Sequence, residues 1–194
     1  MIMLWAIRLG SFLFWRVKTV GQDKRFTVMK TKFTWFLLTW TLGGLWVLVT
    51  MAAGLAAFTS NTTIELNILG YIGIALWLFG FAVEVIADNQ KSQFKKDPNN
   101  QGRFITSGLW SWSQHPNYFG EIILWFGLAL LAFPVLSGWQ LVTLISPIFV
   151  YFLLTKVSGI PILDRMAKEK WGLDSEYINY IKITSKLILV PPKK

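Results

Sequence analysis

The polar side chains that could carry chemistry are concentrated between residues 101 and 130. This stretch holds the only histidine, His115, and an Asn117/Glu121 pair spaced four residues apart. Residues at this spacing share one face of a helix, and the helix predicted here is otherwise apolar. Two polar groups in that setting either bind each other or hold a ligand near the helix N-terminus. Tyr118 adds a phenol beside them that can donate a hydrogen bond.

His115 stands directly before Pro116, at the start of the predicted helix. Its side chain either caps that helix or belongs to the same site as Asn117 and Glu121. With one histidine and no cysteine in the chain, a site built from several imidazoles or thiolates is excluded, and we predict no bound metal. A serine-type catalytic triad could be built only around His115.

A second group of charges shares one face of a helix, at spacings of four, three and four residues: Glu84, Asp88, Lys91 and Lys95. Such a stripe is either solvated or lines the mouth of a cavity that takes a polar, anionic ligand. Glu84 favours the cavity, because a carboxylate inside a membrane span rarely faces lipid.

The remaining polar candidates each have two interpretations. Arg103 suits phosphate recognition, but it could instead anchor its loop to lipid headgroups. Tyr177 and Tyr180, with Trp171, are typical of an aromatic belt at a membrane interface and are also site candidates. Arg8 lies within an apolar helix and therefore requires a partner or a water-filled cavity.

The composition indicates which elements position these residues. Hydrophobic residues make up 54% of the 194-residue chain, with 11 Trp and 15 Phe, which is too much apolar surface for one small soluble core. The net charge of +9 comes from basic residues beside apolar runs, a pattern of membrane flanks rather than of nucleic-acid binding. We therefore expect an integral membrane protein without a nucleic-acid partner.

The pattern predicts an all-α, polytopic membrane bundle in a single domain, residues 1–194. Five membrane helices are expected at about 1–17, 33–58, 66–87, 117–134 and 139–157. The long charge-free run that starts at 122 is divided in two because Pro134 and Ser137-Gly138 interrupt it. Polar loops are expected at 18–32 and 88–116, and an interfacial helix of about 162–182 within the C-terminal segment 158–194. No small-residue cleavage site follows the first apolar run, so it is interpreted as a retained helix.

The basic residues also predict an orientation. Of the nineteen Lys and Arg, six lie in 16–32, four in 88–116 and seven in 164–194, whereas 59–67 and 134–139 have none. Because basic loops face the cytoplasm, the C-terminus and the polar segment before His115 are expected on that side. We expect the inner membrane of a bacterium as the location.

Residues 108–121, GLWSWSQHPNYFGE, resemble the signature of the steroid 5-alpha-reductase superfamily, in particular its bacterial members. The segments 8–26, 87–104, 156–165 and 177–185 are also similar to that family. The resemblance implies an integral membrane oxidoreductase that uses NADPH to reduce a carbon-carbon double bond conjugated to a carbonyl. The implied substrate is a lipid-soluble molecule of steroid-like or isoprenoid type.

The resemblance also implies roles for individual residues. Asn117 and Glu121 match the family residues that contact the nicotinamide end of the cofactor, and Asp88, Lys95 and Arg103 match other cofactor contacts. The remaining candidates for cofactor binding are His115, Tyr118, Lys91, Tyr177, Tyr180 and Arg8. In characterised members a carboxylate and a tyrosine of the N-terminal half polarise the substrate carbonyl. This chain has no acidic residue before Asp23 and no tyrosine before Tyr71, so the catalytic residue is left unassigned.

Two alternatives stay open. Isoprenylcysteine and phospholipid methyltransferases, which use S-adenosylmethionine, share a similar His-Pro-x-Tyr-x-Gly string. They commonly carry a Glu-Glu pair in the C-terminal helix, where this chain has Asp164 and Glu169 but no such pair. The third possibility is a non-catalytic member that binds a lipid. Membrane lipids are expected partners under all three, and the sequence does not indicate an oligomeric state.

Overall fold

The computed structural model describes residues 1–20, 31–62 and 66–192, and in these residues the chain forms helices and no strand. The α-helices are α1 (Ile2–Val20), α2 (Phe33–Phe58), α3 (Ile68–Lys96), α4 (Pro116–Ala132), α5 (Ser146–Phe152), α6 (Ile160–Trp171) and α7 (Ser175–Ile183). Short turns of 3-10 helix lie at Pro98–Asn100, Gly108–Ser111, Phe133–Val135 and Gly138–Ile145, and a π-helical turn at Leu153–Val157. The predicted all-α membrane bundle is confirmed.

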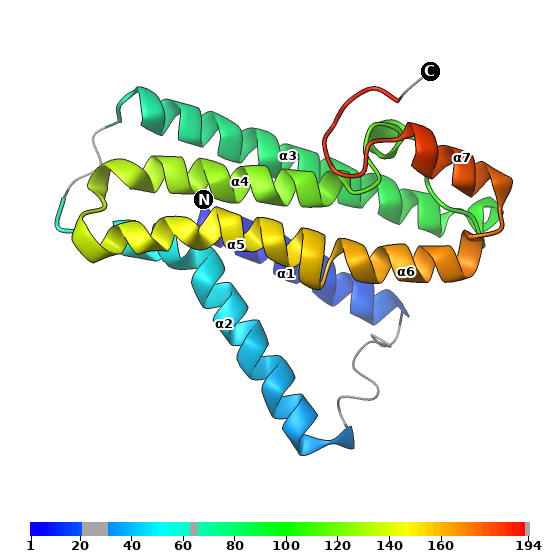
Figure 1. The fold of residues 1–194 in the computed structure, drawn as a ribbon, viewed down its shortest axis with the longest axis horizontal. Helices are drawn as coiled ribbons and strands as arrows, with labels where there is room; N and C mark the ends of the chain where they lie inside the picture. The colour runs from blue at the N-terminus through cyan, green and yellow to red at the C-terminus, as the bar shows by residue number, and fades with distance from the viewer. Residues whose placement is uncertain (21–30, 63–65, 193–194) are drawn as a thin grey trace.

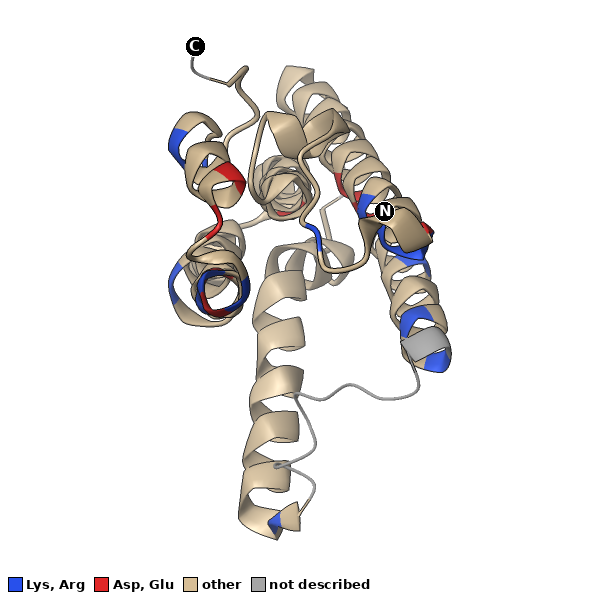
Figure 2. Ribbon diagram, turned by 90° about the vertical axis from the view of Figure 1, so that its right-hand side faces the viewer, with Lys and Arg blue, Asp and Glu red and all other residues tan. Residues whose placement is uncertain are grey.

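Four stretches are long and apolar enough to cross a membrane: Phe33–Phe58, Ile68–Lys96, Pro116–Val135 and Gly138–Trp171. The protein is therefore an integral membrane protein with a large lipid-facing surface. α2 shows this most clearly, because it diverges from the other helices and only Thr50 and Ala53 of it are buried (Figure 1). Its ribbon is tan throughout in Figure 2, because α2 contains no Lys, Arg, Asp or Glu.

The closest contact in the bundle is between α3 and α4, which run antiparallel side by side (Figure 1). Two glycine pairs allow it. A Cβ atom on Gly80 would lie 2.5 Å from the carbonyl oxygen of Gly120, and one on Gly73 would lie 2.7 Å from that of Gly127. Small residues let membrane helices approach to backbone contact, so these four positions fix the spacing and register of the pair.

The main core lies between this pair and the helices that flank it. Trp125 and Leu124 of α4 are fully buried against Val150 of α5, and Trp5 of α1 meets Trp125 edge-on, with ring centroids 4.9 Å apart. Trp77 of α3 closes the same cluster. Trp5 is the apolar anchor that holds α1 to the bundle.

α3 is longer than the helix predicted over 66–87. Its last nine residues, 88–96, were assigned to the polar loop 88–116, but they continue the helix past the apolar span. The segment contains no glycine or proline, and polar side chains by themselves do not end a helix. It ends before Pro98, since a proline disfavours helical geometry at the preceding residue, Asp97.

The C-terminal half differs from the two helices predicted over 139–157 and 162–182. The first is built from 3-10, α and π turns in succession, with Pro147 at the start of the α segment. The second is divided at Gly172 into α6 and α7, and the Asp174 carboxylate caps α7 by accepting hydrogen bonds from the backbone N–H groups of Glu176 and Tyr177. α7 therefore turns back over the end of α3 and α4 (Figure 1).

Candidate functional site

A buried ion-pair network joins α1 to α3 within the bundle. The Arg8 guanidinium donates to Glu84 Oε1 from Nη1 and to Asp88 Oδ2 from Nη2, each at 2.5 Å. Both carboxyl side chains are almost completely enclosed, and a second oxygen of Glu84, Oε2, has no hydrogen-bond partner. Arg8 thus has the partner that an arginine in an apolar helix requires.

Asn117 and Glu121 of α4 face this network. Asn117 Nδ2 donates to Asp88 Oδ1 at 3.3 Å, so Asp88 is held from both sides. Glu121 is buried and acted on electrostatically by Asp88 and Arg8. The close glycine contact brings its helix there, because a Cβ on Gly120 would lie 2.7 Å from the backbone nitrogen of Glu84. We call Arg8, Glu84, Asp88 and Glu121 the acidic cluster.

His115 lies at the helix start as predicted, but its side chain makes no cap hydrogen bond. Its Nε2 lies 3.4 Å from Asp164 Oδ1 of α6, and its ring stacks on Tyr118 with centroids 5.7 Å apart. Burial lowers the pKa of His115 to about 4; Asp164 opposes the shift, and Lys91 and Lys186 add to it. The imidazole is therefore neutral at neutral pH and positions α4 relative to α6.

The segment just before His115, residues 113–114, forms hydrogen bonds with the C-terminal tail, by which we mean the described residues after α7, 184–192. Ser113 and Ser185 form an isolated parallel bridge, and the Gln114 backbone N–H donates to the Ser185 carbonyl at 2.8 Å. Gln114 Nε2 donates to the carbonyls of Ile181 and Thr184, and Ser113 Oγ donates to that of Leu187. The signature and the tail therefore form one unit.

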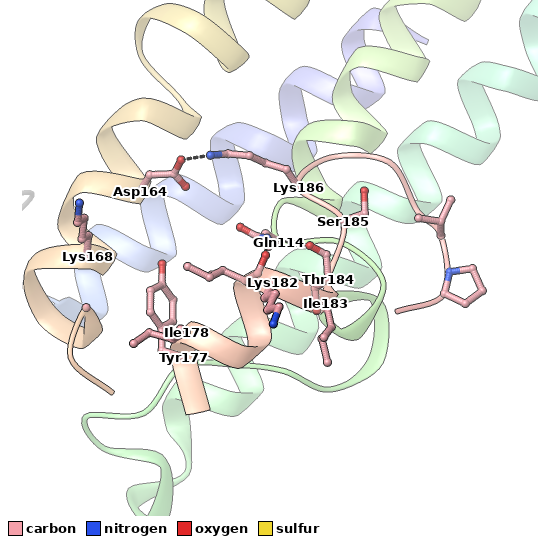
Figure 3. Close-up of a pocket in the computed structure, with 14 residues that line it drawn as sticks. Gln114, Asp164, Lys168, Tyr177, Ile178, Lys182, Ile183, Thr184, Ser185 and Lys186 are labelled. Atoms are coloured by element: carbon pink, nitrogen blue, oxygen red, sulfur yellow. Dashed lines mark hydrogen bonds and ion pairs between the residues drawn. The ribbon is translucent and has the colours of Figure 1, made fainter. Parts of the chain in front are cut away.

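This unit borders an open cavity of about 650 Å³ between α6, α7 and the tail (Figure 3). Its polar lining includes Gln114, Asp164, Lys168, Tyr177, Lys182 and Lys186, and we call it the tail cavity. Figure 3 shows Asp164 and Lys168 on α6 across from Tyr177 on α7, with Lys186 of the tail paired to Asp164. Asp164 also contacts His115, so the cavity adjoins the start of α4.

Other predicted residues lie around Trp110 and at the end of α3. The Lys91 ammonium sits 4.3 Å from the ring centroid of Trp110, and Tyr180 donates its hydroxyl to the Trp110 carbonyl at 2.7 Å. Burial raises the pKa of Tyr180 above its ordinary value, so the phenol stays protonated as that donor. Lys95 is exposed in the last turn of α3. Lys91 and Tyr180 therefore support the loop around Trp110.

Arg103 is also separate. It lines a smaller depression of about 250 Å³ together with Asp174 and Glu176. Neighbouring carboxylates compete with a phosphate for a guanidinium, so this setting does not favour the predicted phosphate contact. Beside it, the ring of Phe104 packs against Trp171, Tyr177 and Tyr180, with centroid distances of 5.2 to 5.7 Å.

The sequence reasoning missed most of the tail cavity. Of its polar lining only Tyr177 was a site candidate, and Asp164 was considered only in the comparison with methyltransferases. One signal was available: Asp164 and Lys168 are four apart on an amphipathic helix, as are Lys182 and Lys186 across the end of α7. Their meeting depends on the turn at Gly172, which the sequence pattern did not predict.

Residues 1–184 match a family described as "Protein of unknown function (DUF1295)". The chain belongs to this family. It is 31% identical over 67 residues to 3-oxo-5-alpha-steroid 4-dehydrogenase 1 of Bos taurus, which covers 34% of this chain and 26% of that protein. It is 34% identical over 84 residues to Delta(14)-sterol reductase of Methylotuvimicrobium alcaliphilum, covering 36% and 20%. The predicted membership of the steroid 5-alpha-reductase-like superfamily is confirmed.

One relative carries a different name. "Probable O-methyltransferase ustE" of Ustilaginoidea virens is 31% identical over 127 residues, which covers 55% of this chain and 45% of that protein. The chain thus spans less than half the length of each of these three relatives. No solved structure matches the chain.

Proposed function

We propose that this protein is a membrane-embedded NADPH-dependent reductase that saturates a conjugated carbon-carbon double bond in a steroid-like or isoprenoid lipid. The observation that carries the proposal is the junction at the start of α4. There the half-buried Asn117 and the buried Glu121 adjoin His115, which contacts Asp164 at the edge of a cavity with three lysines. The names of the steroid dehydrogenase and sterol reductase relatives support the reaction class.

The residues present fit a dinucleotide that is anionic at one end and carries a carboxamide at the other. Lys168, Lys182 and Lys186 supply cationic groups for phosphates. At the other end, the Asn117 amide and the Glu121 carboxyl can bond a carboxamide, and no hydrogen bond to a described residue occupies the Asn117 side-chain oxygen. When bound, the cofactor supplies the hydride.

The chain's own residues have three tasks in this proposal. Asn117, held by Asp88, and Glu121 orient the reacting end of the cofactor. His115 and Asp164 set the distance between that end and the tail cavity. The apolar surfaces of α1 and α4 exclude water from the reaction, which prevents loss of the hydride to solvent. We also propose that the tail cavity faces the cytoplasm at a bacterial inner membrane, because the basic residues gather at that end of the helices.

Thermal unfolding of the purified protein with each cofactor tests the proposal. NADPH at a hundred times its dissociation constant should add about 2.7 kcal/mol to the stability, with a clear rise in midpoint temperature. Asn117→Ala and Glu121→Ala should lose most of this rise, whereas the exposed control Glu169→Ala should retain it. Stabilisation by S-adenosylmethionine alone would overturn the proposal.

The second candidate is an S-adenosylmethionine-dependent methyltransferase. Two observations favour it: the relative named as an O-methyltransferase, and the surplus of carboxyls in the acidic cluster, which suits a sulfonium cation. The three lysines of the tail cavity count against it, since S-adenosylmethionine carries no phosphate. Consumption of NADPH with a panel of enone lipids separates the reductase from the methyltransferase and from a non-catalytic lipid-binding member.

A further inference from the structure

The acidic cluster contains three carboxyl groups and one guanidinium. Glu84, Asp88 and Glu121 are 3%, 7% and 8% exposed, and Arg8 is the cation that acts on them directly. Lys91, the next basic residue along α3, lies over the Trp110 ring and also acts electrostatically on Asp88. If all three carboxyls were ionised, they would outnumber Arg8 and Lys91 together, and an uncompensated negative charge would remain inside a membrane bundle, which is strongly unfavourable.

The hydrogen bonds indicate which carboxyl groups carry the surplus negative charge. Asp88 is bonded by both Arg8 and Asn117, and Glu84 Oε1 is bonded by Arg8. The other oxygen of Glu84, Oε2, is enclosed without any partner. An enclosed carboxylate oxygen that receives no hydrogen bond is costly, whereas a protonated carboxyl supplies its own donor.

Glu121 is the second carboxyl without a firm partner. The Trp125 indole is the weakest influence on its carboxyl, since that N–H has no partner in regular hydrogen-bond geometry among the described residues. Glu121 is in turn the largest charged influence on Glu84. α3 and α4 are in backbone contact at this point, through Gly120 and Glu84. One proton placed between Glu84 and Glu121 removes one surplus charge and partners both side chains.

We propose that Glu84 and Glu121 hold one proton between them, and that Glu121 gives this proton to the substrate during reduction. The second clause rests on the proposed function. A hydride from NADPH, which would be oxidised to NADP+ as its C–H bond breaks, would form a C–H bond at the carbon far from the carbonyl. The double-bond electrons would then move to the carbonyl oxygen to give an enolate. The O–H bond of Glu121 then breaks as its proton forms a C–H bond next to the carbonyl, which leaves a carboxylate that is reprotonated from water.

The two glutamates have different parts in this scheme. Glu121 is the catalytic acid, because Glu84 Oε2 is inaccessible to solvent and Arg8 holds Glu84 in place. Glu84 is a positioning residue that keeps the proton on Glu121 when the substrate arrives. This assigns an acid on α4, within the part of the chain that the structure describes.

Infrared spectroscopy of the purified protein at neutral pH tests the shared proton without any cofactor. The carbonyl band of a protonated carboxyl should be present, should shift in heavy water, and should move when glutamate is ¹³C-labelled. Glu84→Gln and Glu121→Gln should each remove it, and Glu169→Gln, an exposed control on α6, should not. Absence of the band in the wild type, or its survival in both variants, overturns the proposal. If a Gln variant does not fold, the labelled wild-type spectrum decides the point.

Turnover tests the second clause. Glu121→Gln keeps the size and polarity of the side chain, so NADPH should bind within a few fold of the wild type. Turnover of an enone lipid should fall about 100-fold or more, because general acids contribute on this scale. Unchanged turnover in Glu121→Gln removes Glu121 as the acid. If the wild type does not bind NADPH, the proposed function is wrong. The infrared experiment still tests the shared proton by itself, because it uses no cofactor.

Discussion

The acidic cluster and the tail cavity are the two polar regions of this bundle, and they are built in opposite ways. The cluster is enclosed between α1, α3 and α4, and its carboxyls outnumber its one guanidinium. The tail cavity is open between α6, α7 and the tail, and it has three lysines and one carboxylate. His115 and Asp164 lie between them.

The difference indicates how one small membrane protein can bind the two ends of a ligand by different interactions. In the enclosed region a charge is worth several kcal/mol, so its residues decide stability and proton position. In the open region water screens each charge, so the lysines contribute affinity in small increments. Substitutions in the two regions should therefore differ in size and in kind.

The largest effect is expected for Arg8→Met. It leaves Glu84 and Asp88 buried without their cation, which should cost about 3 to 5 kcal/mol of stability. Thermal unfolding in detergent measures this. Arg165→Met is the matched control, because the Arg165–Glu169 pair is exposed on both sides and should contribute at most about 1 kcal/mol. Equal losses in the two variants would show that the cluster is not enclosed.

Gly120→Ala should have the next largest effect. Its Cβ would lie 2.6 Å from the Gly80 carbonyl oxygen, so the α3 and α4 backbones must separate, at about 1 to 3 kcal/mol. Gly43→Ala in α2 meets nothing within 4 Å and should be neutral or slightly stabilising. The same unfolding assay compares them, and a neutral Gly120→Ala would contradict the close contact.

His115 should make the junction sensitive to acid. Its pKa is about 4 in the folded protein against about 6.5 in the unfolded chain, so the unfolded chain binds more protons between these values. The free energy of unfolding should therefore fall as pH drops from about 6.5 to 4, by at most about 3 kcal/mol. His115→Gln should flatten this part of the stability profile. An unchanged slope in the variant would assign the acid effect to other groups.

The smallest effects are expected in the tail cavity. Lys168→Gln and Lys182→Gln should each weaken NADPH binding about two- to five-fold, with a smaller loss at high salt. Lys170→Gln is the control on the same helix, since its ammonium lies over the Trp171 ring, outside the cavity lining. A titration at two salt concentrations measures all three. Equal weakening by Lys170→Gln would mean that net charge alone attracts the cofactor.

Much of the bundle was predictable from local signals. The start of α2 at Phe33 and that of α4 at Pro116 follow from where charge gives way to apolar sequence, and from the proline. The Asn117/Glu121 face follows from helical spacing. The end of α3 was predicted too early, because residues 88–96 are polar, as expected for a loop, but continue the helix.

The contacts between distant segments could not be predicted. Arg8 was expected to need a partner, but its pairing with Glu84 and Asp88 depends on where α1 crosses α3. The tail cavity depends on the break at Gly172 and on the pairing of Ser185 with Ser113. Such contacts arise from packing across 70 or more residues of sequence, for which spacing patterns hold no information.

The glycine contacts between α3 and α4 limit the routes by which a molecule dissolved in the bilayer can reach the acidic cluster. Helices in backbone contact at Gly73/Gly127 and Gly80/Gly120 have no side chains between them to rearrange, so the pair moves as one rigid body. α1 is held to this pair through the Trp5 ring and the Arg8 guanidinium. Opening the cluster to the bilayer on the side of α1 would therefore require the Trp5 and Arg8 contacts to break, while α3 and α4 stay together.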